Sequence, residues 1–187
     1  MKVTSVRYYT LVRWLLLIYS VPSEPSRKRA FVWREIKRAG AVYLHDGVCA
    51  LPQGEAAEAA FDALARRIAE LEGHATLVRD AVLEPAAVAD ATVRMQAARA
   101  GEYAAISQEA KAFLGHIRRE TGHRDLSPVE LQELSADIAK LRRWYQKVQA
   151  RDYTNEGNYV GVDGLLHRCS LTMAQLSNAS SRQGAAR

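Results

Sequence analysis

The first half of the chain alternates between short apolar runs and longer segments in which apolar residues recur every three or four positions. Short runs bounded by Pro, Gly and Asp have the length of buried strands, whereas the periodic segments are typical of amphipathic helices. The pattern predicts strands over 14–21, 41–44, 48–51 and 74–82, and helices over 26–39 and 55–72. The resulting order, β-α-β-β-α-β, is the ferredoxin-like arrangement, so we expect an α+β fold.

Turn residues separate these expected elements. Ser26 can cap the first helix with its hydroxyl, and Gly40 can end that helix in a left-handed conformation. Asp46 and Gly47 predict a hairpin between the second and third strands, because Gly adopts positive φ without strain.

The second half of the chain is helical in pattern. Helices are expected over 86–121, with an interruption near Gly101 left open, over 127–151 and over 164–176. Ser127 and Glu130 form a capping-box pattern around Pro128 at the start of the middle helix. We therefore expect a ferredoxin-like domain over 14–83 and a helical region over 84–176, with residues 1–13 and 177–187 disordered.

Both faces of the predicted sheet are apolar. In the first strand Trp14, Leu16 and Ile18 alternate with Leu15 and Leu17, whereas a sheet with one solvated face alternates apolar with polar residues. An open apolar face would be a large sticky patch. It must be covered either by a second copy of the chain or by the C-terminal helices, and we favour a homodimer.

Positive charge is concentrated near the N-terminus. The formal net charge is +5, and residues 1–54 hold nine Lys or Arg against three acidic residues. This concentration favours an anionic partner such as DNA, although a solvated helix surface would have the same composition. The apolar run at 14–21 is too short to cross a membrane, which needs roughly 20 residues, so we expect no membrane partner.

The helix predicted over 26–39 carries much of this charge. Its expected core stripe is Val32, Trp33 and Ile36. The opposite side carries Arg27, Arg34 and Arg38, with Phe31 beside them and Lys37 at the flank. Clustered arginines can bind phosphates; the alternative is a solvated surface with Phe31 in a protein contact. The candidate DNA-binding residues are Arg27, Lys28, Arg34, Lys37 and Arg38.

Arg29 points near the core stripe in the first turn of the same helix. Backbone N–H groups also face outward there, so Arg29 is a candidate for binding an oxyanion. A structural salt bridge to an acid is the alternative.

Motifs for catalysis are missing. The histidines are scattered, no zinc-ligand spacing occurs, and the sequence has no Walker loop, dinucleotide-binding glycines or nucleophile elbow. Cys49 is expected in the core and Cys169 in helix packing, with a reactive thiol as the alternative for Cys169. Two cysteines make no disulfide framework, which favours the cytoplasm. We expect no enzyme, metal or cofactor.

Four stretches resemble the N-terminal signature of the ChrB chromate-resistance regulators. They read WLLLIYSVPSEPSRKR at 14–29, VWR at 32–34, KRAGA at 37–41 and LHDGVCALP at 44–52, and residues 141–152 are also ChrB-like. A similar sequence pattern occurs in the central domain of PaaX-type repressors. That domain is similar to a dimeric, ferredoxin-like CRISPR-associated nuclease. Ser20, Val21 and Pro22 stand where that nuclease has a catalytic Asp, so the resemblance implies no metal-dependent nuclease here.

The resemblance implies a chromate-responsive transcriptional regulator of a chromate-efflux operon. This chain would be its DNA-binding and dimerisation part, although the second domain usual in ChrB and the winged helix of PaaX proteins are absent from this sequence. Two alternatives stay open. One is a dimerisation or oxyanion-sensing module that binds no DNA, and the other is a redox enzyme that reduces chromate through Cys169.

Overall fold

The computed structural model describes residues 13–121, 126–154 and 160–185. The chain divides into two compact units, the first drawn from Met1–Ala97 with Arg151–Thr154, and the second from Ala98–Ala150 with Asn155–Arg187. The division lies inside one long helix and not at the expected boundary between residues 83 and 84. Residues 1–12, for which disorder was expected, lie outside the described ranges.

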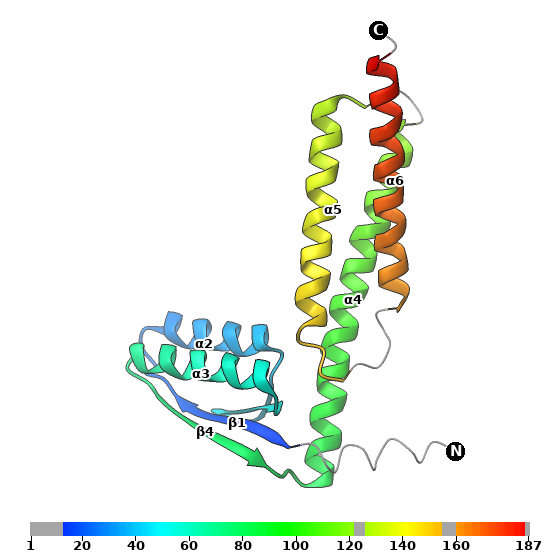
Figure 1. The fold of residues 1–187 in the computed structure, drawn as a ribbon. Helices are drawn as coiled ribbons and strands as arrows, with labels where there is room; N and C mark the ends of the chain where they lie inside the picture. The colour runs from blue at the N-terminus through cyan, green and yellow to red at the C-terminus, as the bar shows by residue number, and fades with distance from the viewer. Residues whose placement is uncertain (1–12, 122–125, 155–159, 186–187) are drawn as a thin grey trace, which may run out of the picture. The chain divides into compact units, whose positions relative to one another are not determined.

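The first unit is a four-stranded antiparallel sheet with two helices over one face (Figure 1). Its elements are β1 (Trp14–Ser20), α2 (Ser26–Ala39), β2 (Val42–His45), β3 (Val48–Pro52), α3 (Glu55–Glu70) and β4 (His74–Ala81). The strands lie in the order β2-β3-β1-β4, and each neighbouring pair is antiparallel. The predicted α+β class is confirmed, and each expected strand and helix of this half is present within a few residues of its predicted bounds.

Two glycines end elements as their sequence context predicts. Gly40 has φ 81°, and its N–H bonds to the carbonyl oxygens at the end of α2. Gly47 has φ 71° between β2 and β3, and its carbonyl accepts a 2.7 Å hydrogen bond from the N–H of Tyr19. The expected cap at Ser26 is wrong, because α2 begins at Ser26 and Pro25 is the N-cap residue, without a side-chain bond.

The core of the first unit lies between the sheet and the two helices. Register pairs Leu15 with Leu51 and Leu17 with Cys49, so the four side chains share one face of the sheet, and all four are fully buried. Val32, Ile36, Phe61 and Ile68 of the helices are equally buried in the same cluster. The prediction that Cys49 is a core residue is confirmed.

The opposite face of the sheet is partly covered from within the unit. Trp14 and Ala50 belong to that face and are buried, and the same cluster includes residues from the first turns of α4 (Pro85–Thr121), namely Val88, Ala91 and Met95. Apolar side chains stay exposed on the part of this face that β1 and β4 form, where Ile18 is 44% exposed and Val78 is 37% exposed.

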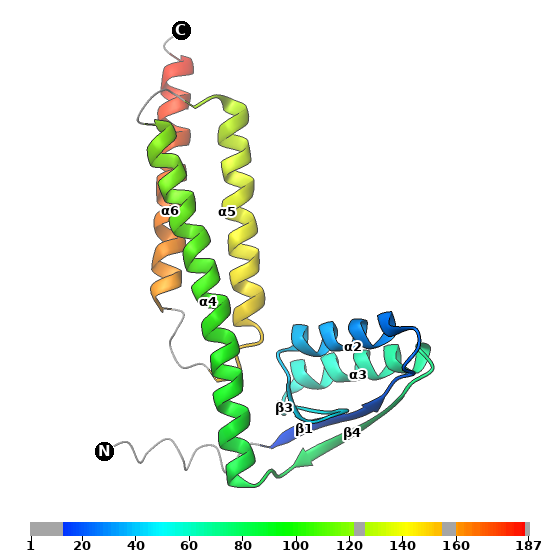
Figure 2. The same ribbon diagram turned by 180° about the vertical axis from the view of Figure 1, so that it is seen from behind.

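The second unit contains the later part of α4 with α5 (Pro128–Gln149) and α6 (Val160–Ala185). The three run side by side, with each consecutive pair antiparallel (Figures 1 and 2). Ser127 and Glu130 form the predicted capping box. Cys169 is fully buried among apolar residues of this unit, which confirms helix packing for it. None of the described helices has the length and apolarity of a membrane span.

The structure resolves one open question about these helices and corrects one expectation. α4 continues through Gly101 without interruption. The last helix is longer than the predicted 164–176, since α6 begins at Val160 and continues to Ala185. Part of the tail expected to be disordered is therefore helical. Disorder was expected because the small and polar residues of this tail form no apolar stripe. Ser, Asn and Ala can nevertheless extend a helix whose earlier turns are held by packing.

Candidate nucleic-acid interface

The helix α2 separates a buried side from a cationic side. Val32 and Ile36 are fully buried, and each such side chain contributes about 1.5–3 kcal/mol of burial free energy. At 100° per residue, the side farthest from these two residues carries Arg27, Ala30, Arg34 and Arg38, with Lys37 at its flank, and all of them are exposed. No acidic residue shares this sector of α2. Three of these cations have no ion pair within the described residues, and we call these three, Arg27, Arg34 and Lys37, the α2 cationic surface.

Two of the five predicted DNA-binding residues are held in ion pairs. Lys28 Nζ contacts the Glu72 carboxylate, and the Lys28 side chain is only 16% exposed. Its hydrogen bond and charge lower the pKa of Glu72. Arg38 pairs with Glu35 one turn earlier on α2. A phosphate would have to compete with a carboxylate at each of these positions, so both are weaker candidates than the α2 cationic surface.

The α2 cationic surface has no ion pair within the described residues. Lys37 instead places its Nζ 5.5 Å from the centroid of the Trp33 ring. An ammonium over an aromatic face is attracted by the ring quadrupole. It keeps its charge and N–H donors, so Lys37 remains able to bind a phosphate.

Trp33 corrects the predicted core stripe. Its side chain is 52% exposed, whereas the sequence pattern places it beside Val32 and Ile36 in the core. The buried sector is shifted toward the other flank of α2, where α3 packs and where Phe31 is half-buried. Phe31 therefore makes a contact within the protein, as the alternative interpretation of this residue predicts.

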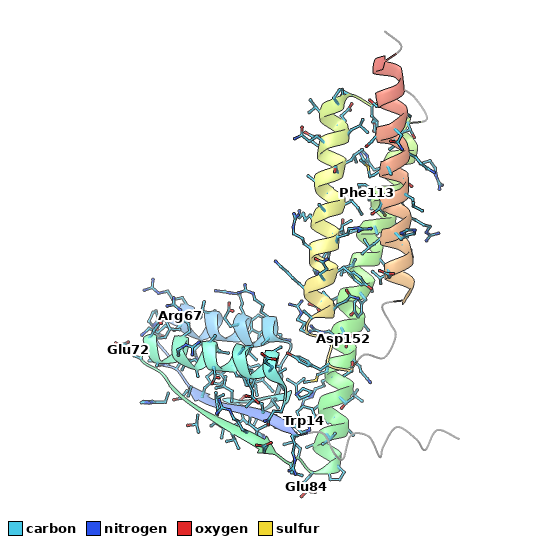
Figure 3. The ribbon with its side chains drawn as sticks, in the orientation of Figure 1. Trp14, Arg67, Glu72, Glu84, Phe113 and Asp152 are labelled. Atoms are coloured by element: carbon cyan, nitrogen blue, oxygen red, sulfur yellow. The ribbon has the colours of Figure 1, made fainter. Side chains whose placement is uncertain are left out.

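Phe31 and Arg67 belong to a shallow groove between α2 and α3. The Arg67 guanidinium lies 5.3 Å from the centroid of the Phe31 ring and is paired with Glu70. The groove has a volume of about 310 Å³ and is lined mainly by apolar side chains. Figure 3 shows Arg67 and Glu72 at the same end of this helical layer. Arg67 is not among the residues predicted from the sequence, although its position next to the buried Ile68 indicates the edge of the core.

Arg29 is exposed in the first turn of α2. None of the acids in the described ranges forms a salt bridge with Arg29. The alternative interpretation, a structural salt bridge, therefore has no support within these residues. Its guanidinium is therefore open to an anion from solution. Arg29 lies four residues before Trp33, and the two side chains share one flank of α2.

The cysteines and one pair of tyrosines have perturbed acidity in the described residues. Burial raises the pKa of the Cys49 thiol to about 12 and also raises that of Cys169, so both are protonated near neutral pH. The Tyr19 and Tyr43 hydroxyls lie 2.9 Å apart, and burial raises the pKa of each. Across the described ranges, no three His, Cys, Asp or Glu side chains gather as metal ligands.

Comparison with known proteins places the chain in a family. The family model described as "Protein ChrB, N-terminal" matches residues 29–183. No curated protein and no solved structure matches the chain. The matched range begins in the cationic helix and continues through most of α6, so it includes residues of both compact units. On this match, the chain belongs to the family defined by the N-terminal part of ChrB.

Proposed function

We propose that this chain is the DNA-binding and dimerising part of a chromate-responsive transcriptional regulator. Membership of the ChrB family supports the association with chromate resistance. The observation that carries the DNA-binding proposal is the α2 cationic surface, with Arg27, Arg34 and Lys37 exposed and no acid among them.

We also assign the first unit to the ferredoxin-like class. The element order β-α-β-β-α-β and the strand order β2-β3-β1-β4 support this assignment, together with the position of both helices over one face of the sheet. This arrangement sets α2 on the outside of the unit, where one side of the helix is free for a partner.

The chemistry of the α2 cationic surface suits the DNA backbone. Arg presents a planar fork of N–H donors that can bind a phosphate through two bonds, and Lys adds a compact charge. Contacts of this kind fix a protein on the duplex without reading its sequence. We therefore assign the backbone contacts to α2 and assign no base contact to these three residues.

A gel shift on the chromate-efflux promoter, with and without chromate, tests the proposal. The wild-type chain should retard the fragment, and the triple variant Arg27→Glu, Arg34→Glu, Lys37→Glu should not. The matched control reverses the same number of exposed cations on α5, Arg142→Glu, Arg143→Glu and Lys147→Glu, and should still bind. Equal binding by both triple variants would show that α2 is not the interface. Release of the wild-type chain by chromate is the expected response of the regulator.

Arg29 is our candidate for the chromate-binding residue. Chromate is a tetrahedral dianion, and a guanidinium beside the N-terminus of α2 offers N–H donors and a partial positive charge of about half a unit. Titration of chromate by calorimetry should give reversible binding to wild type and none to Arg29→Ala. Equal heats for both proteins would remove Arg29 from the account.

A module that dimerises or senses an oxyanion without binding DNA is the second candidate. It is favoured by the position of α2 between β1 and β2, which differs from the consecutive helices of a helix-turn-helix. Absence of any gel shift by the wild-type chain, together with binding of chromate, would support this candidate.

Reduction of chromate through Cys169 is not proposed. The thiolate is the reactive form of cysteine, and Cys169 is fully buried with its pKa raised. Both cysteines are free and buried, which is compatible with the reducing cytoplasm that we propose as the location.

A further inference from the structure

Trp33 is a large apolar side chain left in solvent on the most cationic helix of the first unit. It is 52% exposed, whereas Trp14 is 2% exposed in the core and Trp144 packs against the core of the second unit. A single exposed apolar residue is ordinary on a protein surface. Trp33 differs because exposed cations surround it.

The positions around Trp33 form one continuous exposed strip. Arg29 and Lys37 lie four residues before and after it on the same flank of α2, and Arg34 follows it directly. Lys37 stands over the ring at 5.5 Å from its centroid, and the exposed part of the indole stays open to solvent. A neutral apolar partner would leave these cations uncompensated, so the charge of the strip favours a polyanion.

We infer that Trp33 is an apolar contact residue of the DNA-binding surface. Its ring packs against a deoxyribose or a base edge of the strand whose phosphates are bound by Arg34 and Lys37. The inference rests on the proposed DNA-binding function and adds a residue that the charge pattern alone would not select. Lys37 then has two roles, since it holds the indole in place and contacts a phosphate.

A contact of this kind has a different salt dependence from a phosphate contact. Each phosphate contact releases counterions and adds about −0.9 to the slope of log K against log salt. An apolar contact releases none, so it adds affinity without adding to the slope. Loss of Trp33 should therefore weaken binding by the same factor at every salt concentration.

The test measures fluorescence anisotropy of a short labelled duplex over a series of salt concentrations. Trp33→Ala should bind about tenfold more weakly than wild type, within the range expected for an aromatic contact, with an unchanged slope. Trp33→Phe should restore part of the affinity. Lys37→Ala should reduce the magnitude of the slope by about 0.9.

Val93→Ala is the matched control, because Val93 is also apolar and 61% exposed but lies on α4. It should bind like wild type. Thermal unfolding should be nearly unchanged in both alanine variants, since neither side chain is in the core. Tryptophan emission gives a second readout, because duplex DNA should alter the emission of wild type much more than that of Trp33→Phe.

The outcomes separate this inference from the proposed function. If the wild-type chain binds the duplex and Trp33→Ala binds it equally well, the inference fails and the cationic surface stands. If Trp33→Ala changes the salt slope but not the affinity extrapolated to high salt, Trp33 acts only by positioning Lys37 and the apolar contact is refuted. If the wild-type chain binds no duplex at any salt concentration, both the proposed function and the inference fail.

Discussion

Individual residues on the hairpin between β2 and β3 are constrained by close backbone contacts. Gly47 has φ 71°, and a Cβ at this position would lie 2.6 Å from the carbonyl oxygen of Tyr19. That oxygen belongs to the backbone of β1, which is fixed by its neighbours on both sides. The hairpin therefore tolerates Gly at this position and little else.

Gly47→Ala should lower the free energy of unfolding by roughly 1–3 kcal/mol, because the left-handed conformation is strained for a residue with a Cβ. Urea unfolding measures the change. Gly101→Ala is the contrasting variant, since Gly101 lies within α4 and a Cβ there would meet nothing within 4 Å. It should raise stability by up to about 1 kcal/mol. Equal effects of the two substitutions would contradict the contact at Tyr19.

The Cys49 thiol links stability to pH. Burial raises its pKa from an ordinary value of 9.0 to about 12, so the folded chain holds this proton more tightly than the unfolded chain. The stabilisation is fully present below pH 9 and is lost as the pH rises from 9 toward 12, at up to about 1.4 kcal/mol per pH unit. Tyr19 and Tyr43, whose pKa values are also raised, act in the same direction.

Urea unfolding at pH ~8 and pH ~10 should therefore show a larger loss of stability in wild type than in Cys49→Ala. The comparison uses the change in stability with pH within each protein. The loss of stability caused by the cavity in Cys49→Ala is the same at both pH values, so it cancels. An identical pH dependence in the two proteins would mean that the thiol titrates normally in the folded state.

The N-terminus of α5 is closed by a capping box. The Ser127 hydroxyl accepts a bond from the N–H of Glu130, and the Glu130 carboxylate accepts one from the N–H of Ser127. Removing a cap of this kind typically costs about 1 kcal/mol. The first turn of α5 depends on this pair, because the exposed Pro128 and Val129 contribute no burial there.

Ser127→Ala should lower the free energy of unfolding by about 1 kcal/mol and speed amide hydrogen exchange in the first turn of α5. Ser135→Ala, on the exposed middle of the same helix, should leave stability unchanged or slightly higher, because Ala is the better helix former. Similar losses in both variants would show that the effect is not one of capping.

The elements themselves could be predicted from the sequence, because their periodicity and turn residues are local. The orientation of α2 could not. Val32, Trp33 and Ile36 all fit one apolar stripe, but the flank that becomes buried depends on where α3 packs, and α3 covers Phe31 instead of Trp33. The position of a neighbouring helix is not encoded in the spacing of one segment.

The candidate DNA-binding residues on α2 could also be predicted only in part from the sequence. The concentration of cations on α2 follows from composition, and the pair of Arg38 with Glu35 follows from the i, i+3 rule. The pair of Lys28 with Glu72 joins residues 44 positions apart, so only the fold reveals it. Lys28 and Arg38 are held in ion pairs, so our proposal rests on the other three candidate residues, Arg27, Arg34 and Lys37.

At the scale of the whole molecule, the apolar side of β1 and β4 supports a dimer. Leu16 pairs with Val78 and Ile18 pairs with Thr76, which sets Ile18 and Val78 on one face, and both remain exposed. The first turns of α4 cover another part of the sheet. We propose that a second copy of the chain covers the remainder.

Light scattering at micromolar concentration should give twice the chain mass of 20.8 kDa. Val78→Lys, with a charge at the centre of the apolar face, should shift the protein toward monomer. Leu171→Lys is the control, because Leu171 is 50% exposed on α6. A monomeric wild-type chain would mean that α4 provides enough cover without a second copy.

The central claim is that the α2 cationic surface binds DNA through phosphate contacts. The salt dependence of duplex binding tests it most directly, because the slope of log K against log salt counts those contacts. Three contacts from Arg27, Arg34 and Lys37 predict a slope of about −2.7 per protomer, and replacing all three by Ala should bring it close to zero. A wild-type slope near zero, or the same slope in the triple alanine variant, would contradict the account.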